Sequence, residues 1–294
     1  MGLFSFMTTL ATGIFGSICV IDNLSIKNRR VRIRNHKISK NARFVFLTDM
    51  HGRYFSDTLF GRDFSKLIRM IDSQKPDFVI IGGDMIVSKH GIKIDEAFEL
   101  VRELTKKYKV YYCIGNHEAR LDWDDENDTP YSLLVFKEKI KQCGAVILDN
   151  DAVYLNDYNI QISGVSLVQK YYNKKISVTP SVDELRNLYK SKDDAFNIMC
   201  AHNPEYAGEY RKLNPDLILS GHMHGGLLRL PGGRGFITPK YKLFQKRCWG
   251  VYKDGNVIHI VSQGMANHTL PVRLFNPGEI VTVDIKKKQI PDNK

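Results

Sequence analysis

Residues 44–51 read FVFLTDMH, a short apolar run that ends in an aspartate and a histidine. The same pattern follows at FVIIGGD, residues 78–84, and at VYYCIGNHE, residues 110–118. It returns at FNIMCAH, residues 196–202, and at LILSGHMHGG, residues 217–226. A continuous apolar run of about four to eight residues that ends at turn residues is typical of a buried strand. The sequence therefore predicts five core strands, each followed closely by polar side chains.

Segments with helical spacing separate these strands. Apolar residues recur on one helical face in residues 63–73, 95–108, 133–143 and 182–189. Further strands are predicted at residues 146–148, 153–155 and 160–165, and residues 249–285 are rich in strand formers. Strands that alternate with helices indicate an α/β fold in which helices cover a sheet core.

Composition narrows the class of protein. Of 294 residues, 43% are hydrophobic and 26% are charged, which excludes a disordered chain, a collagen-like fibre and a multi-span membrane protein. The net charge of +11 indicates an anionic partner such as a phosphate, a nucleic acid or a membrane surface. Nucleic acid is disfavoured, because the basic residues gather near the N-terminus without interleaved aromatic residues for base stacking. Five scattered cysteines without a CxxC pair argue against a disulfide framework or a zinc ribbon.

The N-terminal segment Leu3 to Ile21 contains no charged residue, and its nineteen residues fall within the roughly 17 to 25 that span a bilayer. Three interpretations are open: a cleaved signal peptide, a buried or surface-lying amphipathic helix, and an uncleaved membrane anchor. A signal peptide normally has basic residues before the apolar run and a small-x-small site after it, and neither is present. We therefore expect residues 1–24 to be a membrane anchor and residues 25–294 to be one catalytic domain.

A basic collar follows this segment, with no acidic residue inside it: Lys27, Arg29, Arg30, Arg32, Arg34, Lys37, Lys40 and Arg43. The positive-inside rule then predicts a single-pass protein of the cell membrane whose domain lies on the cytoplasmic side. The collar would contact anionic headgroups. Alternatively, or in addition, Val31 and Ile33 alternate with arginines as in an edge strand with one buried face.

Polar side chains that follow the core strands should meet at one edge, because ligands of open α/β sheets bind beyond the carboxyl ends of the strands. Each side chain alone has an ordinary explanation as a turn or a cap. The joint pattern is more specific, since five of nine histidines follow predicted strands: His51, His117, His202, His222 and His224. Mixed imidazole, carboxylate and amide ligands suit Mn, Fe or Zn better than Ca. There are too many ligands for one ion, and two ions about 3.5 to 4 Å apart are typical of phosphoryl chemistry.

In this order, Asp-x-His, Gly-Asp, Gly-Asn-His-Glu, His and Gly-His-x-His resemble the motifs of the calcineurin-like metallophosphoesterase family. The similarity extends from about Phe44 to Glu279. It implies a four-layer β-sandwich flanked by α-helices, with a dinuclear metal site at the C-terminal ends of the strands. The N-terminal segment, the basic strand and a late Pro-x-Arg at residues 271–273 resemble the membrane-anchored bacterial phosphodiesterase branch. Leu227, where that branch has glutamine, and Met223 depart from its pattern.

The resemblance also implies a role for each residue. The seven implied ligands are Asp49, His51 and His224 for the first ion, Asn116, His202 and His222 for the second, and Asp84 bridging both. His117 would donate a proton to the leaving oxygen, and the nucleophile would be a hydroxide that bridges the two metal ions.

The implied activity is phosphoester hydrolysis, of the phosphodiesterase or pyrophosphatase type, with two divalent ions per chain. The anchor and the basic collar favour a lipid-linked phosphoester as substrate. A soluble nucleotide or cyclic nucleotide, a nucleic acid, and a non-catalytic metal-binding scaffold of the same fold are the alternatives. Every implied ligand lies at or beyond Asp49, so residues 1–24 are expected to be dispensable for the metal site.

Overall fold

Strand β2 (Ala42–Leu47) lies inside a six-stranded sheet in the computed structural model of the chain. The sheet order is β1-β15-β2-β3-β4-β5, with bounds β1 Ile26–Asn35, β15 Gly278–Lys287, β3 Phe78–Ile81, β4 Lys109–Cys113 and β5 Val146–Leu148. Strands β2 to β5 run parallel, so their carboxyl ends share one edge. The structure describes residues 3–58, 60–88, 92–123, 131–173, 178–226, 228–230, 234–237, 243–267 and 272–288.

A second six-stranded sheet has the order β13-β14-β9-β8-β7-β6. Its bounds are β6 Ala152–Leu155, β7 Ile160–Val165, β8 Phe196–Ala201, β9 Leu217–Ser220, β13 Gly250–Asp254 and β14 Val257–Val261. The four inner strands are parallel, and the edge strands β6 and β13 are antiparallel to their neighbours. A small third sheet consists of β10 (Arg229–Leu230), β11 (Arg234–Ile237) and β12 (Leu243–Gln245).

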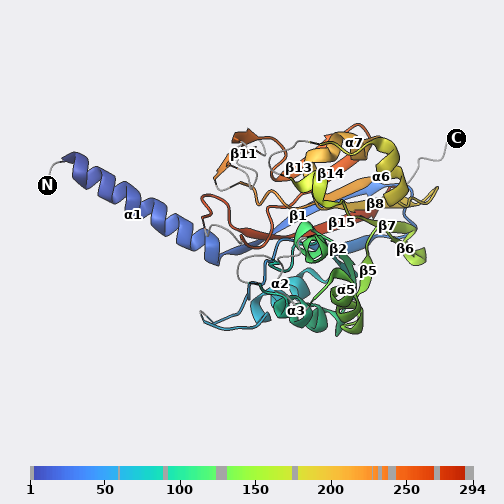
Figure 1. Cartoon of the computed structure of the whole chain (residues 1–294), viewed down its shortest axis with the longest axis horizontal. Helices are drawn as coiled ribbons and strands as arrows, with labels where there is room; N and C mark the ends of the chain where they lie inside the picture. The colour runs from blue at the N-terminus through green and yellow to red at the C-terminus, as the bar shows by residue number, and fades with distance from the viewer. Residues whose placement is uncertain are drawn as a thin grey trace.

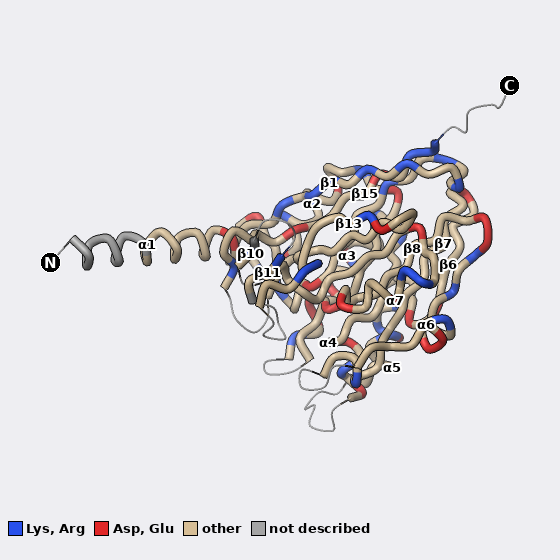
Figure 2. The backbone as a smooth tube through the Cα atoms, turned by 90° about the horizontal axis from the view of Figure 1, so that it is seen from above, with Lys and Arg blue, Asp and Glu red and all other residues tan. Residues whose placement is uncertain are grey.

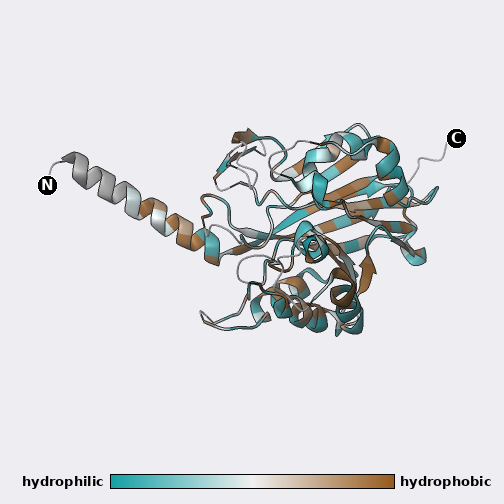
Figure 3. Cartoon of the chain, in the orientation of Figure 1, coloured by the Kyte–Doolittle hydropathy of each residue, from teal (hydrophilic) through white to brown (hydrophobic). Residues whose placement is uncertain are grey.

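The two large sheets pack face to face, and helices cover their outer faces (Figure 1). The outer helices are α2 (Ser65–Gln74), α3 (Asp95–Thr105) and α5 (Leu133–Gln142) on the first sheet, and α6 (Val182–Leu188) and α7 (Ala207–Arg211) on the second. In β2, Val45 and Leu47 contact the helices, while Phe44 and Phe46 pack against the other sheet. Alternate side chains of these strands point to opposite faces, and both faces are buried. This explains why the core strands appear in the sequence as continuous apolar runs (Figure 3). The predicted four-layer α/β fold is confirmed.

The expected edge strand is β1, whose Val31 and Ile33 are buried while the arginines between them are at least partly exposed. It pairs in parallel with β15, so the first strand of the chain lies beside the last described one. Blue segments in Figure 2 mark basic residues along β1 and β15. Three of the eight collar residues are paired within this sheet, and of these Arg30 and Arg43 both bind Asp284, each at 2.6 Å. Arg29 binds Glu279 at 2.8 Å. The collar therefore stabilises the fold through acids that lie far away in sequence.

The N-terminal segment forms one helix, α1 (Leu3–Leu24), which extends away from the body of the protein (Figure 1). Among the described residues, no helix combines the length and the apolar character needed to cross a membrane. Gly13, Gly16 and Ser17 interrupt the apolar residues, and Asp22 turns inward to bind the domain. The expectation of a single-pass cell-membrane protein with its domain on the cytoplasmic side was therefore wrong. The division of the chain at residue 24 stays a prediction, although β1 begins at Ile26.

Candidate metal centre

The carboxyl ends of both sheets meet at one buried site. After the strands of the first sheet come Asp49, His51 and Asp84, in the loops after β2 and β3, and Asn116 and His117, in the short helix α4 (Asn116–Ala119) after β4. After β8 and β9 of the second sheet come His202, His222 and His224. None of these eight side chains belongs to a residue more than 9% exposed. The structure thus brings together every residue that the sequence placed at the site.

The donor atoms form three overlapping groups, in each of which they lie within 4.8 Å of one another: Asp49, His51 and His224; Asp84, His202 and His222; and His51, Asp84 and His117. The Oδ2 atom of Asp84 is 3.1 Å from Nε2 of His202, and Oδ1 of Asp49 is 3.7 Å from the same nitrogen. The two carboxylates therefore reach across from the first sheet to the second.

Asn116 has the features of a metal ligand rather than of a structural amide. Its Oδ1 atom is buried and has no hydrogen-bond partner within the described part of the chain. A buried polar atom left without a partner is costly, and a bound ion is one explanation for it. Together with the carboxylates and imidazoles, this amide makes a donor set that fits a dinuclear divalent metal site.

Three of the histidines are oriented by backbone carbonyls behind them. Their Nδ1 atoms lie 3.3 Å from the carbonyl of Ile86 (His51), 2.8 Å from that of Gly82 (His202) and 3.0 Å from that of Ala266 (His224). A carbonyl accepts but cannot donate, so the proton is on Nδ1 and the Nε2 lone pair faces the site. A backbone carbonyl or carboxylate behind the ring is the usual arrangement of metal-binding histidines.

In His117, the Nδ1 atom faces a hydrogen-bond donor instead of a carbonyl acceptor. Its Nδ1 atom faces the backbone N–H of Ser88 at 3.4 Å, with the Ser88 hydroxyl at the same distance. An N–H only donates, so Nδ1 acts as the acceptor and the ring proton is on Nε2. The third donor group includes His117 by distance alone, yet this tautomer presents a proton, and no lone pair, to the site.

Five of the site residues have an unusual backbone conformation. Asp49, His51, Asp84, His222 and His224 all have positive φ angles between 50° and 68°. Such left-handed conformations in residues other than glycine cost about 1 to 3 kcal/mol each and cluster at functional sites. Gly221 shows how tightly the loops pack, because a Cβ atom there would lie 2.2 Å from Oδ2 of Asp49.

Glu118 was part of the quoted motif, but sequence analysis gave it no role. It is fully buried, and its carboxylate accepts from the backbone N–H groups of Asp84 and Met85, each at 2.8 Å, and of Gly115 at 3.0 Å. The Tyr112 hydroxyl donates to it at 2.8 Å. Glu118 therefore ties the loop after β3 to the loop after β4 and fixes Asp84 beside Asn116. The signal available in the sequence was a glutamate three residues after Gly115, the spacing of a helix capping box.

The electrostatics of the site favour positive charge. Burial raises the pKa of Asp49 to about 7. Burial alone would lower the pKa of His202, but the carboxylates of Asp84 and Asp49 raise it to about 10. Burial likewise acts to raise the pKa of Asp84, yet the imidazoles of His202 and His117 hold it well below its usual value. Two carboxylates buried this closely need cationic neighbours, which is what divalent ions provide.

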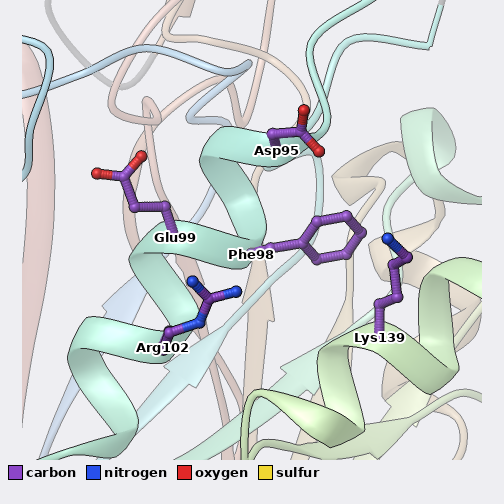
Figure 4. Close-up of a pocket in the computed structure, with 5 residues that line it drawn as sticks. All are labelled: Asp95, Phe98, Glu99, Arg102 and Lys139. Atoms are coloured by element: carbon purple, nitrogen blue, oxygen red, sulfur yellow. The ribbon is translucent and has the colours of Figure 1, made fainter.

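A separate hollow of ≈ 380 Å³ lies between α3 and α5 (Figure 4). It is lined by Asp95, Phe98, Glu99, Arg102 and Lys139, and none of the eight site residues contributes to it. The Lys139 ammonium lies over the Phe98 ring, 5.4 Å from its centroid. The hollow is therefore lined by charges of both signs from two helices, apart from the metal centre.

Two sheets packed face to face, with buried His and Asp side chains at their strand ends, form a site that fits divalent metal ions. A model of the calcineurin-like phosphoesterase family matches residues 42–226, more than half of the chain. The chain therefore belongs to that family.

Bacterial relatives share this class. A metallophosphoesterase of Helicobacter pylori is 26% identical over 86% of this chain and 62% of its own length, and YkuE of Bacillus subtilis is 27% identical over 83% and 79%. The phosphodiesterase YaeI of Escherichia coli is 25% identical over 64% of this chain and 63% of its own. The chain thus spans less than two thirds of the Helicobacter protein. These similarities support the family and give no support to a membrane-anchored branch.

Proposed function

We propose that the chain is a two-metal phosphodiesterase with the ligand roles given above. Asp49, His51 and His224 would hold one ion, Asn116, His202 and His222 the other, and Asp84 both. When bound, the two ions would polarise the phosphoryl group and lower the pKa of the water that they share. The single observation that carries this proposal is the contrast at Nδ1, which faces carbonyls in three of the histidines and an N–H in His117.

His117 is proposed as the general acid. With Nδ1 accepting from Ser88, the ring presents an Nε2 proton toward the site, where it can pass to the leaving oxygen. The main-chain N–H of His117 also donates to Oδ1 of Asp84 at 2.8 Å, so the acid and the bridging carboxylate are held together. An imidazole is suited to this task because its pKa lies near neutrality.

For the substrate, we propose a soluble phosphodiester that carries a planar ring, of the nucleotide class. Tyr172 contacts the edge of the His222 ring, with centroids 5.4 Å apart, and Trp123 lies against Tyr172 at 5.6 Å. These aromatic side chains beside the second ion site can stack on a base. The lipid-linked substrate depended on the membrane anchor, and neither α1 nor the comparisons support it.

The reaction class is tested with metal-free protein loaded with Mn²⁺ or Zn²⁺ and assayed on a nitrophenyl phosphodiester, a monoester and a pyrophosphate. We expect metal-dependent turnover with a preference for the diester. Two bound ions per chain without turnover on any of the three would favour the non-catalytic scaffold. Preferred cleavage of the pyrophosphate would overturn the phosphodiesterase assignment.

The substrate class is tested by two diesters with the same nitrophenolate leaving group, one of thymidine and one of methanol. Stacking on an aromatic side chain contributes about 1 to 3 kcal/mol per base. Trp123→Ala should therefore reduce kcat/KM for the thymidine ester by about 5-fold or more and leave the methyl ester nearly unchanged. Equal losses on both esters would contradict a base-stacking role.

A further inference from the structure

We propose that Asp22, in the last turn of α1, is a positioning residue for the ion held by Asp49, His51 and His224. The proposal rests on the metal site proposed above. Asp22 is only 9% exposed, although most of the described helix residues around it are open to solvent. Its Oδ2 atom accepts a 2.8 Å hydrogen bond from the backbone N–H of Asn276, 254 positions away in the sequence.

Asn276 connects Asp22 to the metal site, because it also contacts the turn that contains His224. It is fully buried, and its Nδ2 atom donates to the backbone carbonyl of His224 at 2.6 Å and to that of Gly226 at 2.8 Å. The amide therefore clamps the turn that presents His224. Gly225, between the two carbonyls, approaches the amide so closely that a Cβ atom would lie 2.6 Å from Oδ1 of Asn276.

The clamp acts on a strained piece of backbone. His224 and Gly225 have φ angles of 51° and 70°. A left-handed histidine persists only where its surroundings fix it, and Asn276 provides two of the fixing contacts. On its other side, the His224 ring faces the Ala266 carbonyl. The position of Nε2 therefore depends on the loop that contains residues 266 and 276.

Arg273 holds this loop from within. It is 1% exposed and donates to the carbonyls of Ala266 at 3.0 Å and Asn276 at 3.2 Å. The Asn276 residue is thus held through its carbonyl by Arg273 and through its N–H by Asp22. Arg273 belongs to the domain, whereas Asp22 belongs to α1, so Asp22 links the N-terminal helix to the metal site.

The proposal predicts that residues 1–24 contribute to the metal site, against the expectation from the sequence that they are dispensable for it. It also predicts selectivity between the two ions. The chain of contacts from Asp22 ends on the carbonyls of His224 and Gly226. His222, two residues before His224, is held instead through its backbone N–H, which donates to the Asp49 carboxylate at 3.1 Å, and His202 is oriented by the Gly82 carbonyl. Loss of Asp22 should loosen one ion and leave the other in place.

The test uses the full-length protein and equilibrium dialysis against a series of free Mn²⁺ concentrations, with bound ions counted by elemental analysis. Outer contacts of metal ligands typically change metal affinity by about 10- to 100-fold. We expect Asp22→Ala to weaken one of the two Mn²⁺ sites by about 10-fold, at the low end of that range, and to leave the other unchanged. Asp22→Asn retains an acceptor oxygen and should restore most of the affinity.

Ser17→Ala is the matched control on the same helix, because the Ser17 hydroxyl is exposed and donates to the Gly13 carbonyl of α1 itself. It should bind two ions as the unchanged protein does. Asn276→Ala should weaken the same Mn²⁺ site as Asp22→Ala does, and the double variant should be no weaker than Asn276→Ala alone, because both residues act in one chain of contacts.

Three outcomes would overturn the proposal. The first is an Asp22→Ala protein that binds both ions with unchanged affinity. The second is an equal loss at both ion sites, which would indicate a general effect on folding. The third is multiplying losses in the double variant, which would show that Asp22 and Asn276 act separately. If Asp22→Ala fails to fold, the comparison of Asp22→Asn with Asn276→Ala decides between the same outcomes. An unchanged protein that binds no Mn²⁺ would instead refute the metal site itself.

Discussion

At the scale of single residues, the atom that faces Nδ1 distinguishes a ligand histidine from an acid histidine in this site. The sequence could place His51, His202 and His224 at strand ends, because apolar runs ending in polar residues have a clear signature. It could not give their tautomers, since the orienting carbonyls of Ile86, Gly82 and Ala266 lie on other segments. The roles of His117 and of the ligands came from family resemblance, and the hydrogen bonds now supply a physical reason for them.

Asp84→Asn tests the bridging role. Asp84 is the carboxylate shared by two of the three donor groups, so replacing one of its oxygens with an NH₂ group should remove a bond to at least one ion and weaken both. We expect activity to be abolished and the metal content to fall at both positions. Elemental analysis of the purified variant measures this, with the exposed Asp193→Asn as control. Two retained ions per chain with normal turnover would refute the two-metal assignment.

His117→Ala tests the general acid. The backbone N–H that binds Asp84 remains, so the ions should stay bound. A positioned acid contributes about 10²- to 10⁴-fold, and it matters most when the leaving group is a poor one. Turnover of an alkyl ester should therefore fall by about that factor, and turnover of a nitrophenyl ester by much less. Equal losses on the two esters would show that His117 does not protonate the leaving group.

At the scale of elements, the sequence predicted each core strand within a few residues but missed how distant strands pair. Alternating Val31 and Ile33 identified β1 as an edge strand, and this was correct. Its partner β15 lies about 250 residues away, and a pairing of that kind leaves no local pattern. For the same reason no acidic partner of the basic collar could be identified in the sequence. In the structure, Asp284 of β15 lies between Arg30 of β1 and Arg43 of β2.

Asp284→Asn tests this contact between strands. Burial acts to raise the pKa of Asp284, but the two arginines lower it to about 2. A carboxylate with a depressed pKa stabilises the fold fully above its unfolded pKa of about 3.9, and this contribution is lost as the pH falls toward 2. The variant should lower the free energy of unfolding by about 2 kcal/mol at pH 7 and by about half as much at pH 3. Urea unfolding at both pH values measures the difference. A cost that does not depend on pH would mean that the loss comes from packing.

At the scale of the whole molecule, the metal centre lies across the junction of the two sheets. The order of the motifs predicted which residues would meet, but not that the first sheet would supply five of them and the second three. That division depends on which strands pair, as does the arrival of Asn276 behind His224. The membrane interpretation of the first segment was wrong because no described helix, α1 included, has the length and apolar character needed to cross a membrane.

If ions hold the sheet ends together, removing them should destabilise the entire fold. An ion present at 100 times its Kd stabilises the folded state by about 2.7 kcal/mol, and for a chain of this size 1 kcal/mol corresponds to roughly 2 to 4 °C. Thermal unfolding after chelation should thus occur about 5 to 10 °C lower, with recovery on adding Mn²⁺. Mg²⁺ should restore less, because it prefers oxygen ligands over imidazoles. Asp84→Asn should show little metal-dependent shift, since it lacks the residue that joins the two ion sites. Loaded and metal-free proteins that melt at one temperature, with two ions bound in the former, would show that the sheets are held together without the metal.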